Sequence, residues 1–218
     1  MPDRPDVRPP ISLAGALAAE HLAVLRDEET PPSGFRRAAA ALGALVVAEA
    51  LRGLEGAPGR VATPVATAEV TRLTRGITLV PVLRAGLALL GPALELTPGE
   101  PRVGFLGMAR DEVTLRPRSY LVSLPDGVGE DDVLVLEVMI ATGGSSVAAL
   151  DALAARGARR VALAALIAAP EGLEAIRRSH PGVPVTVAAI DPGLDGRGFI
   201  VPGLGDAGDR LYGVAGEA

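Results

Sequence analysis

The sequence predicts an α/β fold in which helices cover both faces of a parallel sheet. Apolar runs such as residues 77–82, 133–136 and 161–168 are continuous rather than alternating, which is typical of strands buried on both faces. Segments with apolar residues at helical spacing follow these runs, and glycine or proline marks many of the boundaries. This alternation of strand and helix favours a parallel sheet.

The N-terminal third is predicted to hold two helices and an arm. Residues 13–29 and 34–54 are rich in alanine and leucine at helical spacing, and the breaker PPSG at residues 31–34 separates them. Residues 61–73 alternate loosely between apolar and polar side chains, which indicates an extended arm.

From residue 77 onward, strands and helices are expected to alternate. The predicted strands are 77–82, 103–108, 133–136, 161–168 and 183–190, and the predicted helices are 87–96, 145–156 and 171–179. Residues 109–131 are polar and punctuated by proline, so they are expected to be irregular and to leave the sheet. Ligands of parallel sheets bind beyond the carboxyl ends of the strands. Functional residues are therefore expected just after these runs.

Composition limits the chemistry that is available. The 218 residues have a net charge of −5, which gives no basic field for nucleic acid. All the basic residues are Arg, Cys is absent, and His21 and His180 are the only histidines, which excludes thiol and lysine chemistry and argues against a protein metal site. Residues 1–12 are expected to be a loose tail before a single domain at 13–218. No signal-like or membrane-spanning apolar segment is evident, so a cytoplasmic location is expected.

A carboxylate and a glycine-rich turn follow the run at 133–136. The segment LEVMIATGGSS (136–146) places Glu137 at a strand end and two glycines with three hydroxyls at the start of a helix. Free N–H groups at a helix start attract anions, and glycine lets an anion approach the backbone. A plain glycine turn with a serine cap is the alternative. The preceding carboxylate favours a ligand that carries both a phosphate and ribose hydroxyls.

Two arginines and the C-terminal segment are the other candidates. Arg84 lies in a Leu-Arg-Ala-Gly turn at a strand end, where a guanidinium can grip a diphosphate, although a surface arginine is the common alternative. Arg110 begins a charged segment that can close over an anion or remain a solvated loop. Residues 190–214 are rich in glycine and aspartate; they form either a disordered tail or, given the apolar residues 199–201, an ordered loop that reads a small planar base through its backbone.

These segments resemble the uracil phosphoribosyltransferases. The resemblance is carried by LVPVLRAGLALL (79–90), GFLGMARDEVTL (104–115), MIATGGSS (139–146) and IDPGLDGRGFIVPGLGDAGDR (190–210). It implies a type I phosphoribosyltransferase fold, a parallel sheet flanked by helices with a small hood or arm. It also implies conversion of uracil and 5-phosphoribosyl diphosphate to UMP and diphosphate, with Mg²⁺ carried mainly by the diphosphate substrate, no dedicated metal ligands, a homodimer or higher homo-oligomer, and GTP as a candidate effector.

The resemblance also implies a role for each candidate residue. Arg84, Arg110 and Asp206 are expected to be catalytic and to contact the ribosyl donor. The rest of the donor site is expected to comprise Glu137, Val138, Met139, Ile140, Ala141, Thr142, Gly143, Gly144 and Ser145. Uracil is expected to contact Ile200, Gly205, Asp206 and Ala207.

One departure from the family pattern lies inside the donor motif. The family usually has Asp-Pro-Met-Leu-Ala-Thr where this chain has Glu137-Val138-Met139-Ile140-Ala141-Thr142. Glu137 keeps the charge but adds a methylene, and Val138 restores a backbone N–H. Two alternatives therefore stay open: a paralogue that binds nucleotide as a regulator, and a phosphoribosyltransferase for another base.

Overall fold

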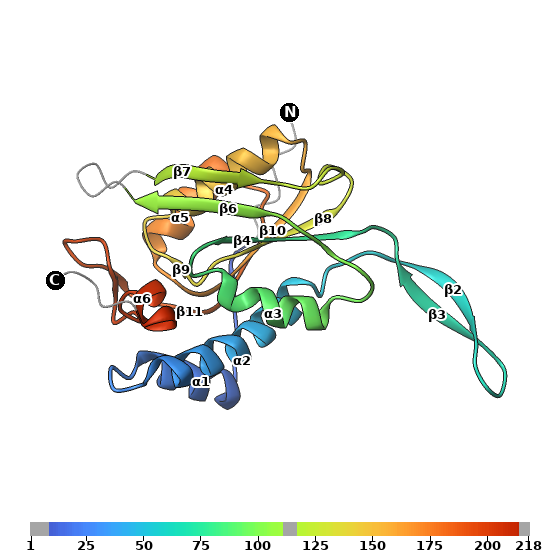
Figure 1. Ribbon diagram of the computed structural model, residues 1–218, viewed down its shortest axis with the longest axis horizontal. Coiled ribbons are helices and arrows are strands. Elements are labelled where there is room, and N and C mark those ends of the chain that lie inside the picture. The colour runs from blue at the N-terminus through green and yellow to red at the C-terminus, as the bar shows by residue number, and fades with distance from the viewer. Residues whose placement is uncertain (1–8, 111–116, 214–218) are drawn as a thin grey trace.

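Continuous apolar runs form the central sheet of the computed structural model, which describes residues 9–110 and 117–213 (Figure 1). The strand order is β1-β11-β10-β8-β4-β6-β7, and every pairing on this path is parallel except that of β6 with β7. The bounds are β1 Ile11–Ser12, β4 Ile77–Leu83, β6 Phe105–Arg110, β7 Pro117–Ser123, β8 Asp132–Leu136, β10 Arg160–Ala168 and β11 Val185–Ile190, with β5 (Arg102–Val103) beside β4 and β9 (Met139–Ile140) beside β10.

Helices cover both faces of this sheet, as predicted. One layer contains α1 (Ala16–Arg26), α2 (Pro32–Ala50) and α3 (Leu87–Leu96), and the other contains α4 (Gly144–Ala155) and α5 (Pro170–Ser179) (Figure 1). Within β8, Leu134 and Leu136 pack in the core on the α2 side, while Val133 and Val135 pack in the core on the α4 side. Both core clusters exclude water from strand residues, which explains why β4, β8, β10 and β11 are apolar at most positions.

Two predicted boundaries are wrong. Residues 109–131 do not simply leave the sheet, because β7 lies within them and pairs antiparallel with β6. Its exposed side chains, including Tyr120 and Val122, hid the strand pattern, since β7 is an edge strand without a buried face of its own. The expected tail is also shorter, because Ile11 and Ser12 form β1 and pair with β11. Residues 1–8 lie outside the described residues.

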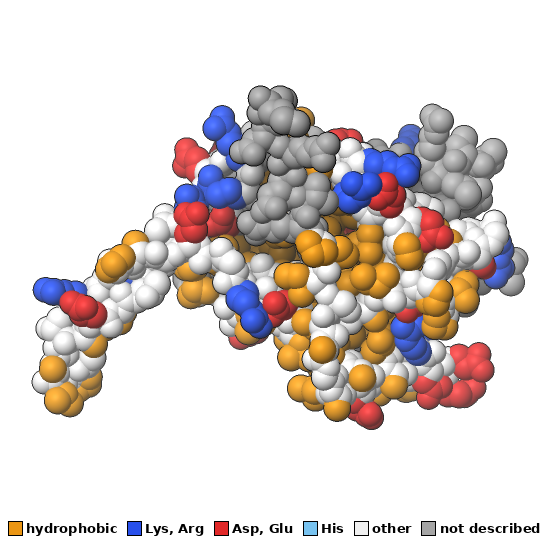
Figure 2. Space-filling view, turned by 180° about the vertical axis from the view of Figure 1, so that it is seen from behind, with side chains coloured by type: hydrophobic (Ala, Val, Ile, Leu, Met, Phe, Trp, Pro, Cys, Tyr) orange, Lys and Arg blue, Asp and Glu red, His pale blue; other side chains and the backbone are white. Residues whose placement is uncertain are grey.

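The predicted arm is a hairpin of β2 (Gly56–Ala62) and β3 (Thr67–Leu73). It stands away from the body of the molecule, and hydrophobic side chains gather at its tip (Figure 2). Val65 at this tip is 94% exposed.

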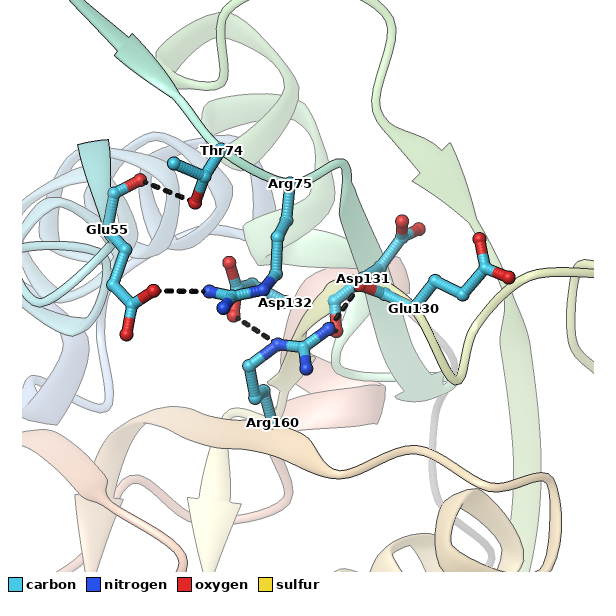
Figure 3. A network of polar contacts seen from close by, with 7 residues as sticks. All are labelled: Glu55, Thr74, Arg75, Glu130, Asp131, Asp132 and Arg160. Atoms are coloured by element: carbon cyan, nitrogen blue, oxygen red, sulfur yellow. Dashed lines mark hydrogen bonds and ion pairs between the residues drawn. The ribbon is translucent and has the colours of Figure 1, made fainter. Parts of the chain in front are cut away.

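A network of charged residues secures the base of the hairpin and the amino ends of the strands (Figure 3). Arg75 pairs with Glu55 at 2.8 Å, which joins the two ends of the hairpin, and Arg160 donates to Asp132 at 3.1 Å, which joins β10 to β8. Buried Asp131 accepts from the Thr78 hydroxyl at 2.6 Å. These charges lie at the edge opposite the carboxyl ends of the strands, so they stabilise the scaffold there.

The C-terminal segment is ordered. It forms the short pair β12 (Gly193–Leu194) and β13 (Ile200–Val201), followed by α6 (Ala207–Tyr212). The disordered alternative is thereby excluded for residues 190–213. Among the helices that the structure describes, none is both long enough and apolar enough to cross a membrane.

Candidate active site

Three segments that are distant in sequence meet at the carboxyl edge of the sheet. The turn after β4 packs so closely on the end of β8 that a side chain at Gly86 would collide with the carbonyl oxygen of Leu136. On its other side, the Tyr212 hydroxyl of α6 donates to the carbonyl oxygen of Arg84 at 3.2 Å. The turn with Arg84 therefore lies between the loop that follows β8 and the start of α6, as the sheet topology predicts.

The glycine loop, residues 137–146, begins with a buried carboxyl group. Glu137 is 6% exposed, and its carboxylate accepts a hydrogen bond from the Ser146 hydroxyl in the first turn of α4. Burial raises the pKa of Glu137 to about 7, against the smaller lowering effect of this hydrogen bond. At neutral pH the side chain therefore changes readily between its neutral and charged forms. Ser146 was not among the predicted site residues.

The backbone of the glycine loop is anchored to β10. The carbonyl oxygen of Val138 accepts from the N–H groups of Leu166 and Ile167 at 3.0 and 3.1 Å, and that of Ile140 accepts from Ala169 at 2.9 Å. Val138 and Ile140 are buried, so their side chains belong to the core. They hold the loop in place through packing and backbone hydrogen bonds.

The end of the glycine loop has the geometry of an anion site. Gly143 adopts φ +80° just before α4, and a Cβ there would lie 2.6 Å from the carbonyl oxygen of Gly172. Only glycine fits this conformation and this close approach. No side chain caps the N-terminus of α4 within the described chain, so the first N–H groups of the helix remain available to a ligand. Thr142 is exposed beside them, and Gly144 and Ser145 are partly exposed.

Arg84 and Asp206 border the same small residue. The Arg84 guanidinium and the Asp206 carboxylate both lie within 4 Å of the Cβ position of Gly208. Arg84 is 58% exposed and lies 3.6 Å from Asp209, while Asp206 caps α6 by accepting from the Asp209 N–H at 3.0 Å. The structure thus brings together an exposed cation and two carboxylates at the start of α6.

The C-terminal loop, residues 191–206, offers backbone groups at Gly205 beside the Asp206 carboxylate. Ile200 and Ala207 are buried, whereas Gly205 is exposed and adopts φ +68°. Arg210 binds the carbonyl oxygen of Leu204, while the N–H and carbonyl oxygen of Gly205 have no hydrogen-bond partner within the described chain. Such a surface suits a flat ligand that is read by main-chain N–H and C=O groups.

A family model described as uracil phosphoribosyltransferase matches residues 13–214, which include all three segments. The chain belongs to the uracil phosphoribosyltransferase family. A uracil phosphoribosyltransferase of Corynebacterium glutamicum is 46% identical over 197 residues, covering 90% of this chain and 93% of that protein. One of Thermus thermophilus is 47% identical over 199 residues, covering 91% and 95%.

Solved structures share the fold of this chain. The AQ2163 protein from Aquifex aeolicus superposes with a TM-score of 0.88 at 36% identity, covering 94% of this chain and 98% of that one. A hypoxanthine-guanine phosphoribosyltransferase from Bacillus anthracis has a TM-score of 0.50 at 14% identity, covering 70% and 76%, and this likeness concerns the fold alone. The predicted type I phosphoribosyltransferase fold is confirmed.

Two further features of the predicted site concern the loop arginine, Arg110, and metal binding. Arg110 ends β6 opposite Pro117, so its backbone reaches the carboxyl edge of the sheet, but its side chain and residues 111–116 lie outside the described residues. Among the described residues, no group of three or more His, Asp or Glu side chains is arranged to hold a metal ion.

Sequence reasoning missed the residues that support the C-terminal loop. Arg26 pairs with the buried Asp191, and Arg210 donates to the carbonyl oxygens of Leu25 and Leu204. The contacts of Arg26 with Asp191 and of Arg210 with Leu25 cross more than 160 residues of sequence, so no local pattern indicated them. The only available signal was the charged residue Asp191 directly after an apolar strand.

Proposed function

We propose that the protein transfers the phosphoribosyl group of 5-phosphoribosyl diphosphate to uracil, forming UMP and diphosphate in the cytoplasm. The observation that carries this proposal is the meeting of an anion-binding loop, an exposed arginine and a backbone-lined loop at one edge of the sheet, in a member of this family. Each group matches one part of the two substrates.

The glycine loop is assigned to the ribose and its 5′-phosphate. The uncapped N–H groups of α4 and the exposed Thr142 hydroxyl suit the phosphate. Glu137, at the other end of the loop, is assigned to the ribose hydroxyls, which a carboxylate binds with two acceptor oxygens. Arg84 and Arg110 are assigned to the diphosphate, because guanidinium groups bind such anions in a bidentate manner.

The C-terminal loop is assigned to uracil. Ile200 offers an apolar contact and the peptide groups of Gly205, Asp206 and Ala207 offer donors and acceptors for the edge of the base. The chain contains no Asn or Gln, so backbone groups are the natural readers of an amide-like edge.

The reaction needs alignment and charge stabilisation more than reactive side chains. The bond from C1 of the ribose to the diphosphate oxygen breaks, the bond from C1 to N1 of uracil forms, and the N1 proton is lost. Positive charge gathers on the ribose ring while the leaving diphosphate gains negative charge. Arg84 stabilises that departing charge, and the two loops hold C1 and N1 in line.

Mg²⁺ is expected to reach the site mainly on the diphosphate. This cation commonly uses one or two carboxylates together with substrate phosphates. The exposed Asp206, close to Arg84, fits the role of such a carboxylate. When bound, Mg²⁺ neutralises charge on the leaving diphosphate.

The protein is also expected to form a homodimer or higher homo-oligomer. The hairpin of β2 and β3 supports this proposal, because it projects from the body and carries exposed Val65 and Pro64 at its tip (Figure 2). Exposed apolar side chains on a projecting element are typical of an interaction surface.

One observation favours a second candidate, a nucleotide-binding regulator with weak turnover. Glu137 is buried against Ser146, so the carboxylate assigned to ribose is turned into the protein. If this arrangement persisted with ligand bound, the ribose would lose its acceptor and catalysis would suffer more than phosphate binding.

Conversion of radiolabelled uracil to UMP, with 5-phosphoribosyl diphosphate and Mg²⁺, tests the proposal. Cytosine, hypoxanthine and guanine serve as parallel substrates, and we expect product from uracil alone. Tight donor binding without product from any base would reject the enzyme and support the regulator.

The variant Glu137→Asp with Val138→Pro separates the two candidates further. It restores the family's usual pair, and the Val138 N–H donates to no other group of the described chain, so proline removes no hydrogen bond. We expect activity equal to or above that of the wild type. An inactive but folded double variant would indicate a site rebuilt for another ligand.

A further inference from the structure

The C-terminal loop has few backbone hydrogen bonds of its own at the point where it approaches the site. Between β13 and α6, Gly203 and Gly205 adopt φ of +65° and +68°, and a Cβ at Gly203 would collide with the carbonyl oxygen of Ile200. No backbone–backbone hydrogen bond holds Gly203 within the described chain. Its position must therefore be fixed by side chains.

One ion pair binds both polar groups of the Gly203 peptide backbone. The Gly203 N–H donates to the Asp191 carboxylate at 2.9 Å, and the Gly203 carbonyl oxygen accepts from the Arg26 guanidinium at 3.1 Å. Arg26 and Asp191 also bind each other through two contacts of 2.9 and 2.5 Å. The Arg26 guanidinium, the Asp191 carboxylate and the Gly203 backbone thus form a cyclic hydrogen-bond network, in which each orients the other two.

This pair is itself fixed on rigid elements. Asp191 follows β11, is 4% exposed, and donates its N–H to the carbonyl oxygen of Ala168 at the end of β10 at 2.8 Å. Arg26 is the last residue of α1. Burial alone would raise the pKa of Asp191, but the hydrogen bonds from Arg26 and Gly203 outweigh it and hold that pKa below its usual value. The carboxylate therefore stays ionised and keeps both partners.

Arg210 strengthens the same connection from α6. Its guanidinium donates to the carbonyl oxygens of Leu25 and Leu204, which flank Arg26 in α1 and Gly203 in the loop. In Figure 1, α6 lies beside α1 and α2, away from the glycine loop's helix α4. The segment before α6 is thus attached to α1, whereas the glycine loop is attached to β10.

We propose that Arg26 and Asp191 are positioning residues that hold Gly203 so that Gly205, Asp206 and Ala207 present their backbone groups to the base. This inference rests on the proposed uracil transfer. Neither side chain needs to touch a substrate, because the Gly203 peptide carries the constraint two residues along the chain to Gly205. The pair acts mainly on base binding, because the glycine loop on the donor side is held by β10 and leads into α4, and only Asp206 among the assigned donor contacts lies in the positioned segment.

The test measures the KM for uracil and the KM for 5-phosphoribosyl diphosphate separately in Asp191→Asn and Arg26→Ala. We expect the KM for uracil to rise about 10-fold or more, the scale of one lost charge-assisted hydrogen bond. The KM for the donor should rise much less, because Asp206 is the one assigned donor contact in this segment and the glycine loop and Arg84 lie outside it. The KM for uracil of the double variant should not exceed that of the more severe single variant, because either change disrupts the same hydrogen-bond network.

Two further variants make the result decisive. Arg26→Lys keeps a positive charge beside Asp191 but cannot hold both the carboxylate and the Gly203 carbonyl oxygen, so its uracil KM should be intermediate. Arg177→Ala is the matched control, because the exposed Arg177 side chain pairs with Glu174 of the same helix, α5, and not with the Arg26–Asp191 pair, so both KM values should match the wild type. If Asp191→Asn does not fold, Arg26→Lys provides the measurement.

An unchanged uracil KM in folded variants, or an equal rise in both KM values, overturns the inference and leaves a general structural role. Failure of the proposed function looks different, since the wild type itself would then form no UMP. In that case calorimetric titration with UMP and with the donor replaces the kinetics, and selective weakening of UMP binding in the variants still supports the positioning role.

Discussion

The glycine loop and the C-terminal loop lie at the same edge of the sheet but are held in different ways. Residues 137–146 continue β8, form β9 beside β10, and bury Val138 and Ile140 in the core. Residues 191–206 lie beyond β11 and depend on Arg26, Asp191 and Arg210 for their shape. One half of the site is thus fixed by apolar packing and backbone pairing, and the other by charged side chains.

Because of this difference, substitutions in the two loops should have different effects on the stability of the fold and on substrate binding. The glycine loop shares its residues with the core, so changes there should affect the free energy of unfolding as well as ligand binding. The C-terminal loop is attached through a few polar contacts, so changes there should affect one substrate more than the fold. Substitutions in each loop test this comparison.

The largest expected effect concerns the buried carboxyl group of the glycine loop. The pKa of Glu137 is about 7 in the folded protein, against 4.5 for a glutamate exposed to water in the unfolded chain, so between these values the folded state holds one proton more. Stability should therefore fall as the pH rises from about 4.5 to 7. Glu137→Gln removes this titration, and its unfolding free energy relative to wild type should rise by about 3 kcal/mol between about pH 4 and pH 8.

Urea denaturation of both proteins across this range gives the measurement. Ser146→Ala serves as a companion, because loss of the Ser146 hydrogen bond should raise the pKa of Glu137 further and shift the pH dependence upward. A difference between Glu137→Gln and wild type that does not vary with pH would contradict the buried, titrating carboxyl group.

A smaller loss, in rate rather than stability, is expected where the two loops meet. Arg84→Ala and Asp206→Ala should each lower UMP formation by at least about 100-fold, or about 2.7 kcal/mol of transition-state stabilisation. Arg84 is exposed, so Arg84→Ala should change the melting temperature little, whereas Asp206→Ala also removes the N-cap of α6 and should lower the stability by about 1 kcal/mol. Initial rates are compared with those of Arg178→Ala, which removes another exposed arginine on α5. A near-normal rate in either variant would show that the residue has no catalytic role.

A matched pair of glycines tests the packing of the glycine loop. Gly143 and Gly157 adopt φ of +80° and +79°, but only at Gly143 would a Cβ approach other atoms, 2.6 Å from the Gly172 carbonyl oxygen. Gly157→Ala should cost about 1 kcal/mol from its backbone conformation alone, and Gly143→Ala about 2 kcal/mol or more. Donor affinity, measured by calorimetry, should fall only in Gly143→Ala. Equal losses in both variants would mean that the loop can move away from Gly172.

The smallest expected effect is a shift in melting temperature. 5-Phosphoribosyl diphosphate should stabilise the protein more in Mg²⁺ than in EDTA, because the cation neutralises the diphosphate beside Arg84 and the nearby carboxylates. Uracil alone should produce little shift. Equal donor shifts in Mg²⁺ and EDTA would argue against a metal-bound donor, and the absence of any shift would argue against donor binding.

Local sequence pattern determined most of the fold and the donor half of the site. The continuous run of β8, the glycine turn and the start of α4 are adjacent in sequence, so residue type alone placed Glu137 at a strand end and Gly143 at a helix start. The same reasoning failed for β7, whose exposed edge position produces no burial pattern, and for Ile11 and Ser12, whose partners in β11 lie more than 170 residues further along the chain.

Only the tertiary structure decided the burial and the partners of the charged side chains. The sequence predicted Glu137 as a carboxylate at a strand end; its burial against Ser146 and its raised pKa follow only from the packing of β8 against α4, which excludes water. Folding also joins Arg26 to Asp191 across 165 residues, which no periodicity or motif encodes. Helices and strands follow from local side-chain pattern, whereas the environment of a charge depends on which distant segments pack around it.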